Sequence, residues 1–211
     1  LGDLDIVAVL AQTPYALVVQ ARAGLTTLDD LKAAAARNGE LTFGTLSAGV
    51  SLYSVLSGRL AQHLGVPHRM IPYKGGVEGL TAVMAGDIDG FFVTVALAQT
   101  ARDNPKARLL GVTAGPGGSP FLPGTKSFVD QGVKDMALRT LLLLMARAGM
   151  PPDTRTRLER MLRGVADSDE MRRARASLSL EEFPGPLDDG KQEMARIVDS
   201  LRRAGAADAA R

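Results

Sequence analysis

The hydrophobic residues of this chain fall into short continuous runs that alternate with segments of helical periodicity. The clearest example is residues 41–64, where an apolar run is followed by a loop of Gly, Thr, Ser and Ala and then by leucines at Leu52, Leu56, Leu60 and Leu64. Leucines four residues apart lie on one face of a helix, and a short apolar run bounded by turn residues is typical of a buried strand. This stretch therefore predicts a strand, a loop and an amphipathic helix.

The same alternation continues in both directions along the chain. Residues 5–20 are rich in Val, Leu and Ala and are interrupted by Thr13-Pro14, which favours two short strands that meet at the proline. Thr27 followed by Asp30 predicts a capped helix start, and Gly39 a helix end. Further strands are predicted at 69–71, 88–95, 107–113 and 138–145. Further helices are predicted from the loop at 72–76 to Gly86 and over 96–102, 154–163, 167–176 and 187–203, with a frayed tail at 204–211.

Strands that alternate with helices indicate an α/β layered fold with a mainly parallel sheet. Such sheets bind ligands at the carboxyl ends of their strands, where the two glycine-containing loops, at 45–51 and 72–76, are expected to lie. A helix N-terminus presents unpaired backbone N–H groups and a partial positive charge. We therefore expect the loop that enters the helix at 52–64 to bind a carboxylate.

Composition narrows the range of functions. With 211 residues, 45% hydrophobic and 23% charged, the chain is ordinary globular material that forms one large domain or two small ones. The formal charge of +2 is too balanced to predict nucleic-acid binding, although the pI near 9.1 keeps that option open. Absence of Cys excludes disulfides and thiolate chemistry. No apolar run reaches membrane-spanning length, and the leader of an exported protein would lie upstream of Leu1.

Candidate catalytic groups are scarce. His63 and His68 have no carboxylate pair at metal-ligand spacing nearby and are expected at the surface. No GxSxG elbow occurs, and no serine has a plausible base. We therefore predict no catalytic residue, no metal site and no cofactor, and expect that the protein is not an enzyme.

Several motifs occur in an order that resembles a known family. They are DxxxVAxLxxTPxxLVV near the start, a Ser/Gly loop before a Leu-rich helix, IPYKGG, LxxxMAGxIDxxF, LLGVT and MARAGMPPDTRTRL. In these motifs the chain resembles the substrate-binding proteins of tripartite tricarboxylate transporters, also called Bug-type periplasmic receptors.

The resemblance implies a periplasmic-binding-protein-like fold of type II. Two α/β lobes, each with a mainly parallel sheet flanked by helices, would close on a small organic acid by a hinge motion. Residues 13–139 would form the complete second lobe, and residues 1–12 and 140–211 the remainder of the first. Family members carry additional strands before the point that matches Asp5, so the first lobe is expected to be incomplete. We predict that a partner chain, self-association or a swapped segment covers the apolar sheet edges that such a lobe exposes.

The resemblance also assigns site residues. Six match the family's ligand-binding loop: Thr45, Ser47, Ala48, Gly49, Ser51 and Ser54. Their hydroxyls and amides would supply uncharged donors, and Gly49 would let the backbone approach the ligand closely. Alternatively, Ser47 or Ser51 only caps the following helix. Family loops often read GxGS followed by His, which this loop lacks.

Two further residues are candidates for ligand contact. Tyr73 belongs to the PYKG turn, and Thr94 follows a buried strand at the position where many relatives carry a polar residue. Alternatively, the turn is structural, with Tyr73 packed near the hinge, and Thr94 is a buried strand residue. The Lys of this turn lacks the Ser or Thr of a Walker motif.

The function expected from the resemblance is that of a periplasmic solute-binding protein. It would capture a carboxylate-bearing metabolite and deliver it to membrane transporter subunits or to a sensor, with no nucleic-acid partner. The alternatives are an effector-binding domain of a cytoplasmic transcription regulator and an enzyme on the same fold.

Overall fold

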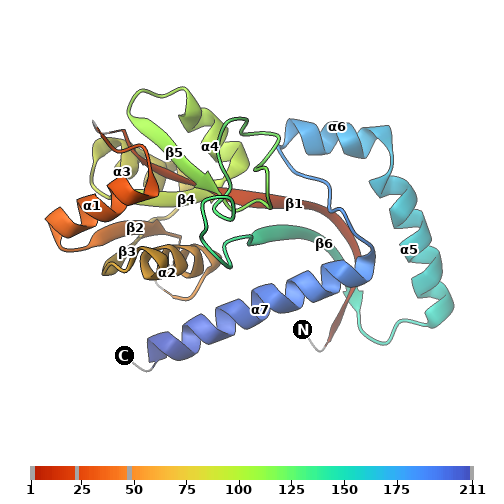
Figure 1. Cartoon of the computed structure of the whole chain (residues 1–211). Coiled ribbons are helices and arrows are strands. Elements are labelled where there is room, and N and C mark those ends of the chain that lie inside the picture. Colours follow the sequence, from red (N-terminus) through yellow and green to blue (C-terminus); the bar gives the residue numbers. More distant parts are fainter. Residues whose placement is uncertain (1–2, 22–23, 47–48, 210–211) are drawn as a thin grey trace. The chain divides into compact units, whose positions relative to one another are not determined.

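Helices and strands alternate along the chain in the computed structural model, which describes residues 3–21, 24–46 and 49–209 (Figure 1). The strands are β1 (Leu4–Gln20), β2 (Leu41–Thr45), β3 (His68–Pro72), β4 (Gly90–Thr94), β5 (Ala107–Val112) and β6 (Arg139–Arg147). The helices are α1 (Leu28–Asn38), α2 (Leu52–Leu64), α3 (Gly76–Ala85), α4 (Val95–Arg102), α5 (Pro152–Ala166), α6 (Asp169–Ser177) and α7 (Leu187–Ala209). Each predicted strand and helix is confirmed, apart from two differences near the ends of the chain.

The first difference concerns the proline in β1. Two strands that meet at Pro14 were expected, but the structure has one strand of 17 residues. The ladder between β1 and β4 begins at Tyr15, so the missing N–H of Pro14 removes no hydrogen bond from it. The second difference is at α7, which continues past the predicted end at Arg203 as far as Ala209. The expected frayed tail is therefore mostly helical, and residues 210–211 lie outside the described part.

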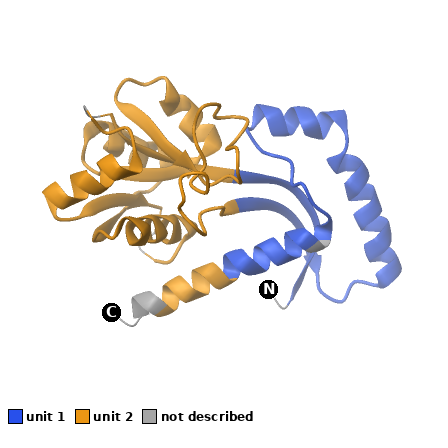
Figure 2. Cartoon of the chain, in the orientation of Figure 1, with its two compact units in different colours: residues 1–13, 140–198 blue, residues 14–139, 199–211 orange. Residues whose placement is uncertain are grey.

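The chain forms two compact units (Figure 2). Unit 1 contains residues 1–13 and 140–198, and unit 2 contains residues 14–139 and 199–211. The interpretation of these units as the first and second lobes of a binding protein stays a prediction.

Unit 2 is built on a mixed sheet in the order β3-β2-β4-β1-β5. β2 runs parallel to β3 and β4, whereas β1 runs antiparallel to β4 and β5. All strands of this sheet except β1 therefore point the same way, as the alternating pattern predicts.

Successive residues of β1 pack on opposite faces of this sheet. Leu17 and Val19 contact the core cluster that includes leucines of α1 and α2. Ala16 and Val18 contact the cluster that includes residues of α3 and α4. Because the strand is apolar on both faces, it is buried between two helical layers. This arrangement aligns the strand ends from which α2, α3 and α4 begin.

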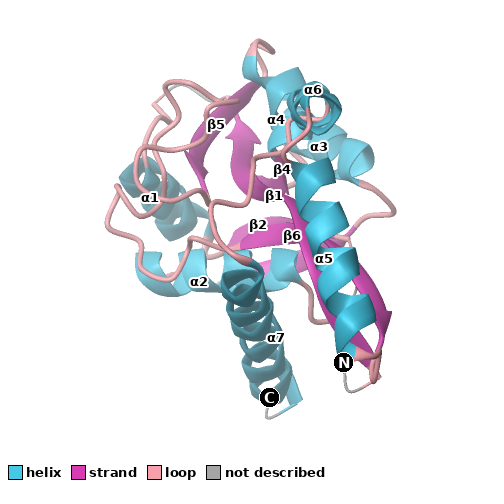
Figure 3. Cartoon of the chain, turned by 90° about the vertical axis from the view of Figure 1, so that its right-hand side faces the viewer, coloured by secondary structure: helices cyan, strands magenta, loops and turns pink. Residues whose placement is uncertain are grey.

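Unit 1 consists of the first part of β1, most of β6, the helices α5 and α6 and the first part of α7 (Figure 2). Figure 3 shows α5, α6 and β6 from a second side. β6 pairs with β1, and Ala148 N–H donates to the Asp3 carbonyl at 3.0 Å. The buried guanidinium of Arg175 donates to the carbonyl oxygens of Leu10 (3.2 Å) and Ala166 (2.8 Å), which ties α6 to β1 and to the end of α5.

Candidate functional site

Three helices begin at the same edge of the sheet in unit 2. α2, α3 and α4 follow β2, β3 and β4, which end at Thr45, Pro72 and Thr94. Because β2 is parallel to both β3 and β4, the three carboxyl ends meet at one edge. Each helix N-terminus carries a partial positive charge and backbone N–H groups without an intrahelical acceptor. This edge is therefore suited to bind an anion.

A capping box is formed at the start of α2. The Ser51 hydroxyl accepts a hydrogen bond from Ser54 N–H at 3.3 Å, and the Ser54 hydroxyl accepts one from Ser51 N–H at 2.9 Å. The sequence left open whether Ser51 caps this helix, and in the structure its side chain does so. The capping box does not use the N–H groups of Leu52 and Tyr53, and first-turn N–H groups of a helix have no intrahelical acceptor.

Thr45 connects this helix start to the neighbouring turn. Its side chain is only 2% exposed, and its hydroxyl lies 3.3 Å from the Ser51 hydroxyl. Its carbonyl accepts a hydrogen bond from Tyr73 N–H at 2.8 Å. The structure therefore brings Thr45, Ser51, Ser54 and Tyr73 together.

The remaining predicted site residues are placed as follows. Gly49 belongs to the loop before α2, whereas Ser47 and Ala48 lie outside the described residues. Thr94 is half-buried and is the N-cap residue of α4, and its side chain makes no capping hydrogen bond. Gly75, the N-cap of α3, cannot provide one. The first turns of α3 and α4 thus lack the side-chain cap that α2 has.

An acidic side chain in the first turn distinguishes the start of α3 from the starts of α2 and α4. The Glu78 carboxylate accepts a hydrogen bond from Lys74 N–H at 2.9 Å. Burial raises the pKa of the Tyr73 hydroxyl, and the negative charges of Asp87 and Glu78 raise it further. The Glu78 carboxylate, in the first turn of α3, would repel an anion bound there. The starts of α2 and α4 are consequently the more favourable positions for a carboxylate.

An aromatic cluster that the sequence did not predict lies beside the start of α2. The Tyr53 ring stacks on Phe91 with centroids 5.8 Å apart and meets Tyr15 edge to face at 5.3 Å. The ring centroid of Tyr73 lies 6.4 Å from that of Phe91. Burial, followed by the neighbouring Tyr15 hydroxyl, raises the pKa of Tyr53, so its hydroxyl stays protonated at neutral pH. One sign of this cluster was present in the sequence. Tyr53 is an aromatic residue in a Ser-rich helix start, and only 4% of the residues of this chain are aromatic.

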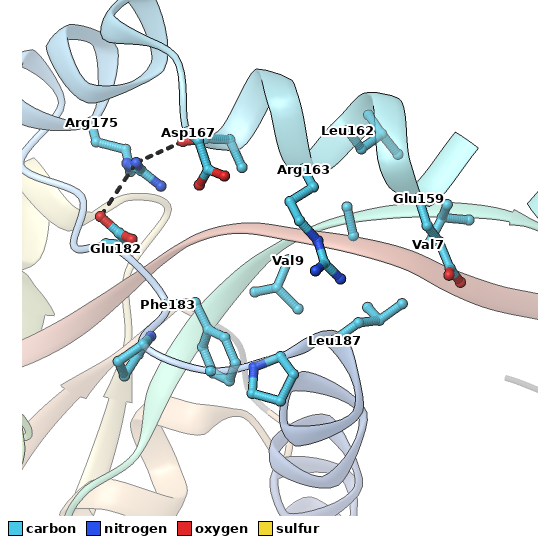
Figure 4. Close-up of a pocket in the computed structure, with 15 residues that line it drawn as sticks. Val7, Val9, Glu159, Leu162, Arg163, Asp167, Arg175, Glu182, Phe183 and Leu187 are labelled. Atoms are coloured by element: carbon cyan, nitrogen blue, oxygen red, sulfur yellow. Dashed lines mark hydrogen bonds and ion pairs between the residues drawn. The ribbon is translucent and has the colours of Figure 1, made fainter. Parts of the chain in front are cut away.

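A cavity of about 460 Å³ lies in unit 1 (Figure 4). It is lined by residues of β1, α5 and the segment before α7, and the predicted site residues, which all belong to unit 2, do not contribute to it. Arg163 and Arg175 line it together with Glu159, Asp167 and Glu182. Because the charges are mixed and Arg175 already donates to main-chain carbonyls and to Glu182, this cavity is a poor site for a carboxylate.

Two further features are absent from the described residues. No group of three or more His, Asp or Glu side chains is arranged to hold a metal ion. None of the described helices is both long and apolar enough to cross a membrane.

Sequence comparisons identify relatives of this chain. The model of a family described as tripartite tricarboxylate transporter family receptor matches residues 1–208. A UPF0065 protein of Cupriavidus necator is 28% identical over 182 residues, which are 86% of this chain and 54% of the relative. A UPF0065 protein of Bordetella pertussis is 24% identical over 168 residues, or 79% and 50% of the two chains. The chain thus spans about half the length of these curated relatives.

Solved structures share the fold. A Rhodopseudomonas palustris protein solved with adipate has a TM-score of 0.77 at 21% identity, covering 97% of this chain and 69% of its own. MatC of the same species, solved with malate, has a TM-score of 0.73 at 18% identity, covering 94% and 69%. A ligand-free TctC solute-binding protein from Polaromonas has a TM-score of 0.72 at 18% identity, covering 97% and 69%. At these identities the likeness concerns the fold alone, and roughly a third of each longer chain has no counterpart here.

Proposed function

This chain belongs to the family of tripartite tricarboxylate transporter receptors, and we propose that it is the ligand-binding part of a solute-binding protein for a small carboxylate. The observation that carries the proposal is the convergence of three helix N-termini at one edge of the unit 2 sheet. The R. palustris relatives solved with adipate and malate support the same class of ligand.

In this proposal, the ligand carboxylate accepts hydrogen bonds from backbone N–H groups in the first turn of α2. The Ser51–Ser54 capping box holds that turn in place, and the buried Thr45 hydroxyl contacts the Ser51 hydroxyl. The start of α4 adds a second partial positive charge. Tyr53 and Tyr73, held against Phe91, would contact the apolar part of the acid. The uncharged donors would select for a carboxylate group. The neighbouring side chains would determine which acid carries it.

The receptor would act outside the cytoplasm. We propose a periplasmic protein whose two lobes close on the ligand and which then interacts with membrane transporter subunits or a sensor. The family and the fold are those of solute-binding receptors, so we assign no catalytic step.

A thermal-shift screen against organic acids, with adipate and malate as the first probes, tests the site. Ser51→Ala should lower the free energy of unfolding by about 1 kcal/mol and weaken ligand binding about tenfold, because the first turn of α2 loses its cap. The matched control is Thr27→Ala, which removes the equivalent capping box from α1. α1 follows β1, which runs opposite to β2, so its start lies at the other edge of the sheet.

The control should lose the same stability and keep the ligand-induced shift. If Ser51→Ala retains the full ligand-induced shift, or if both variants lose it equally, the start of α2 is not the binding site.

We further propose that another polypeptide segment, from a partner chain or a swapped copy, covers the apolar surface of unit 1. α5 has no buried residue, and Met161 on this helix is 62% exposed. In β6, Leu142 is 47% exposed and Leu144 is also exposed. Within the described residues β6 pairs with β1 alone. A strand made of consecutive apolar residues is normally covered on both faces of its sheet. An apolar strand at an unpaired sheet edge promotes association with another chain.

The oligomeric state of the 211-residue chain tests this second proposal. We expect self-association in light scattering, which Leu142→Thr combined with Leu144→Thr should reduce because threonine keeps the strand propensity and removes apolar area. Leu178→Thr is the control, since Leu178 is 59% exposed but lies beyond the end of α6. A stable, monodisperse monomer that binds no hydrophobic dye would contradict the proposal.

A further inference from the structure

The C-terminal part of α7 that belongs to unit 2 lies against α2. Arg59, in the middle of α2, donates from Nη2 to the Ser200 hydroxyl at 3.0 Å and from Nη1 to the Asp135 carbonyl. Leu201 and Ala204 pack against the core cluster that contains Val55 and Leu56 of α2. One arginine thus joins α2 to both α7 and the loop before β6.

The contact extends to the entry of α2. A β-carbon placed on Gly205 would lie 3.5 Å from Cγ2 of Val50, which is ordinary van der Waals contact. Val50 immediately precedes the N-cap residue Ser51. Ser200 is hydrogen-bonded to Arg59, and Gly205 lies beside Val50. This part of α7 therefore runs along α2 toward the candidate carboxylate site.

The loop that accepts the other hydrogen bond of Arg59 is conformationally strained. Asp135 has a φ of 59°, a left-handed conformation that few residues other than glycine adopt. Such strain persists only where the surroundings hold it. Burial lowers the pKa of Arg59, partly opposed by the charge of Asp135, but a guanidinium stays protonated at neutral pH. Arg59 therefore remains able to donate this charge-assisted hydrogen bond at neutral pH.

From these contacts we propose that residues 199–205 of α7 are a positioning element for the carboxylate site. They contribute none of the proposed ligand contacts but hold the helix that presents the first-turn donors. Backbone N–H groups bind a carboxylate only when they are held in a narrow range of distance and direction. Loosening α7 would therefore weaken ligand binding without removing a ligand contact. This inference rests on the proposed function, since it assigns α7 a role at the same site.

Arg59→Met and Ser200→Ala test the inference, because methionine keeps the apolar stem of the arginine and removes both hydrogen bonds. Arg69→Met is the matched control: Arg69 is an exposed arginine of unit 2 that pairs with Glu40 at 2.9 Å. The first measurement is amide hydrogen exchange of residues 50–56 without ligand. We expect exchange there to become at least about tenfold faster in Arg59→Met and less so in Ser200→Ala, with β2 and β4 unchanged.

The second measurement is calorimetric titration with adipate and with malate. We expect the dissociation constant to rise about three- to tenfold in Arg59→Met and to stay at the wild-type value in Arg69→Met. Unchanged exchange at residues 50–56 in Arg59→Met overturns the positioning role, whatever the titrations give. If the wild-type protein binds no organic acid, the proposed function fails, and faster exchange in Arg59→Met would then support only the attachment of α2 to α7. Wild-type affinity in Arg59→Met despite faster exchange also overturns the inference.

Discussion

Phe91 lies where two glycines leave room for its ring. A β-carbon on Gly44 of β2 would come within 2.6 Å of Cδ2 of Phe91, and one on Gly79 of α3 within 2.5 Å of Cε1. The same ring stacks on Tyr53 beside the candidate site. Both glycines are therefore explained by close packing around one aromatic side chain, because any larger residue would displace the ring.

Gly79→Ala should destabilise the protein although alanine favours helices. We expect a loss of about 1–3 kcal/mol from overpacking, reduced by up to about 1 kcal/mol of helix propensity. Gly164→Ala in α5 is the control, since a β-carbon there meets nothing within 4 Å, and it should stabilise by about 0.5–1 kcal/mol. Urea denaturation of both variants measures the two effects. A Gly79→Ala variant as stable as the wild type would mean that the Phe91 ring has room to move.

The residues of the candidate site were predictable only in part. Ser51 and Ser54 were expected because they lie three residues apart where a Ser-containing loop enters a helix. Tyr53 was missed because its importance depends on Tyr15 and Phe91, which are 38 positions away on either side and reach it only through the sheet. The ligand contacts assigned to all eight predicted residues stay predictions.

At the scale of single elements, the start of α1 shows how closely local sequence determines a helix end. The Asp30 carboxylate accepts hydrogen bonds from the N–H groups of Thr26 and Thr27, both at 2.8 Å, as the spacing of Thr27 and Asp30 predicts. These bonds, that from Thr26 first, lower the pKa of Asp30 from 3.8 to about 2. Capping by this carboxylate therefore requires its charged form.

The lowered pKa predicts how the stability of α1 depends on pH. The contribution of Asp30 is fully present above pH 4 and is lost as the pH falls through about 2, because protonation removes the acceptor charge. Asp30→Asn should therefore destabilise the protein at neutral pH, and the difference from wild type should shrink between pH 4 and pH 2. Denaturation midpoints measured across this range test the expectation. Asp29→Asn is the control, since Asp29 makes none of these hydrogen bonds, and an equal pH dependence in both variants would contradict the assignment.

For the whole molecule, the two units differ in how much apolar surface they bury. The largest fully buried side chains all lie in unit 2. They are Phe43, Phe91, Phe92, Phe128, Leu17, Leu31, Leu41, Leu56, Leu60, Ile88, Leu122 and Met136. Unit 1 instead contains the uncovered α5, the exposed leucines of β6 and the cavity. Since burial of apolar area is the main stabilising term, unit 2 should hold most of the stability.

Amide hydrogen exchange of the 211-residue chain tests this difference. We expect unit 1 to open without unfolding of unit 2, so the amides of β6 within unit 1 should exchange at least about tenfold faster than those of β4. A polypeptide segment that covers unit 1 should slow the exchange of β6 and leave β4 unchanged. Equal protection of the two strands in the isolated chain would show that unit 1 is closed without a further segment.

Local pattern in the sequence by itself determined the order of helices and strands, the cap at Thr27 and the family to which the chain belongs. These depend on periodicity and on motifs within a few neighbouring residues. The tertiary structure alone decided that β1 passes through Pro14 as one strand, that Tyr15, Tyr53 and Phe91 meet, and that α7 reaches the start of α2. The physical reason is that ladder register and side-chain packing join residues far apart in the chain, and local sequence does not encode which distant residues come into contact.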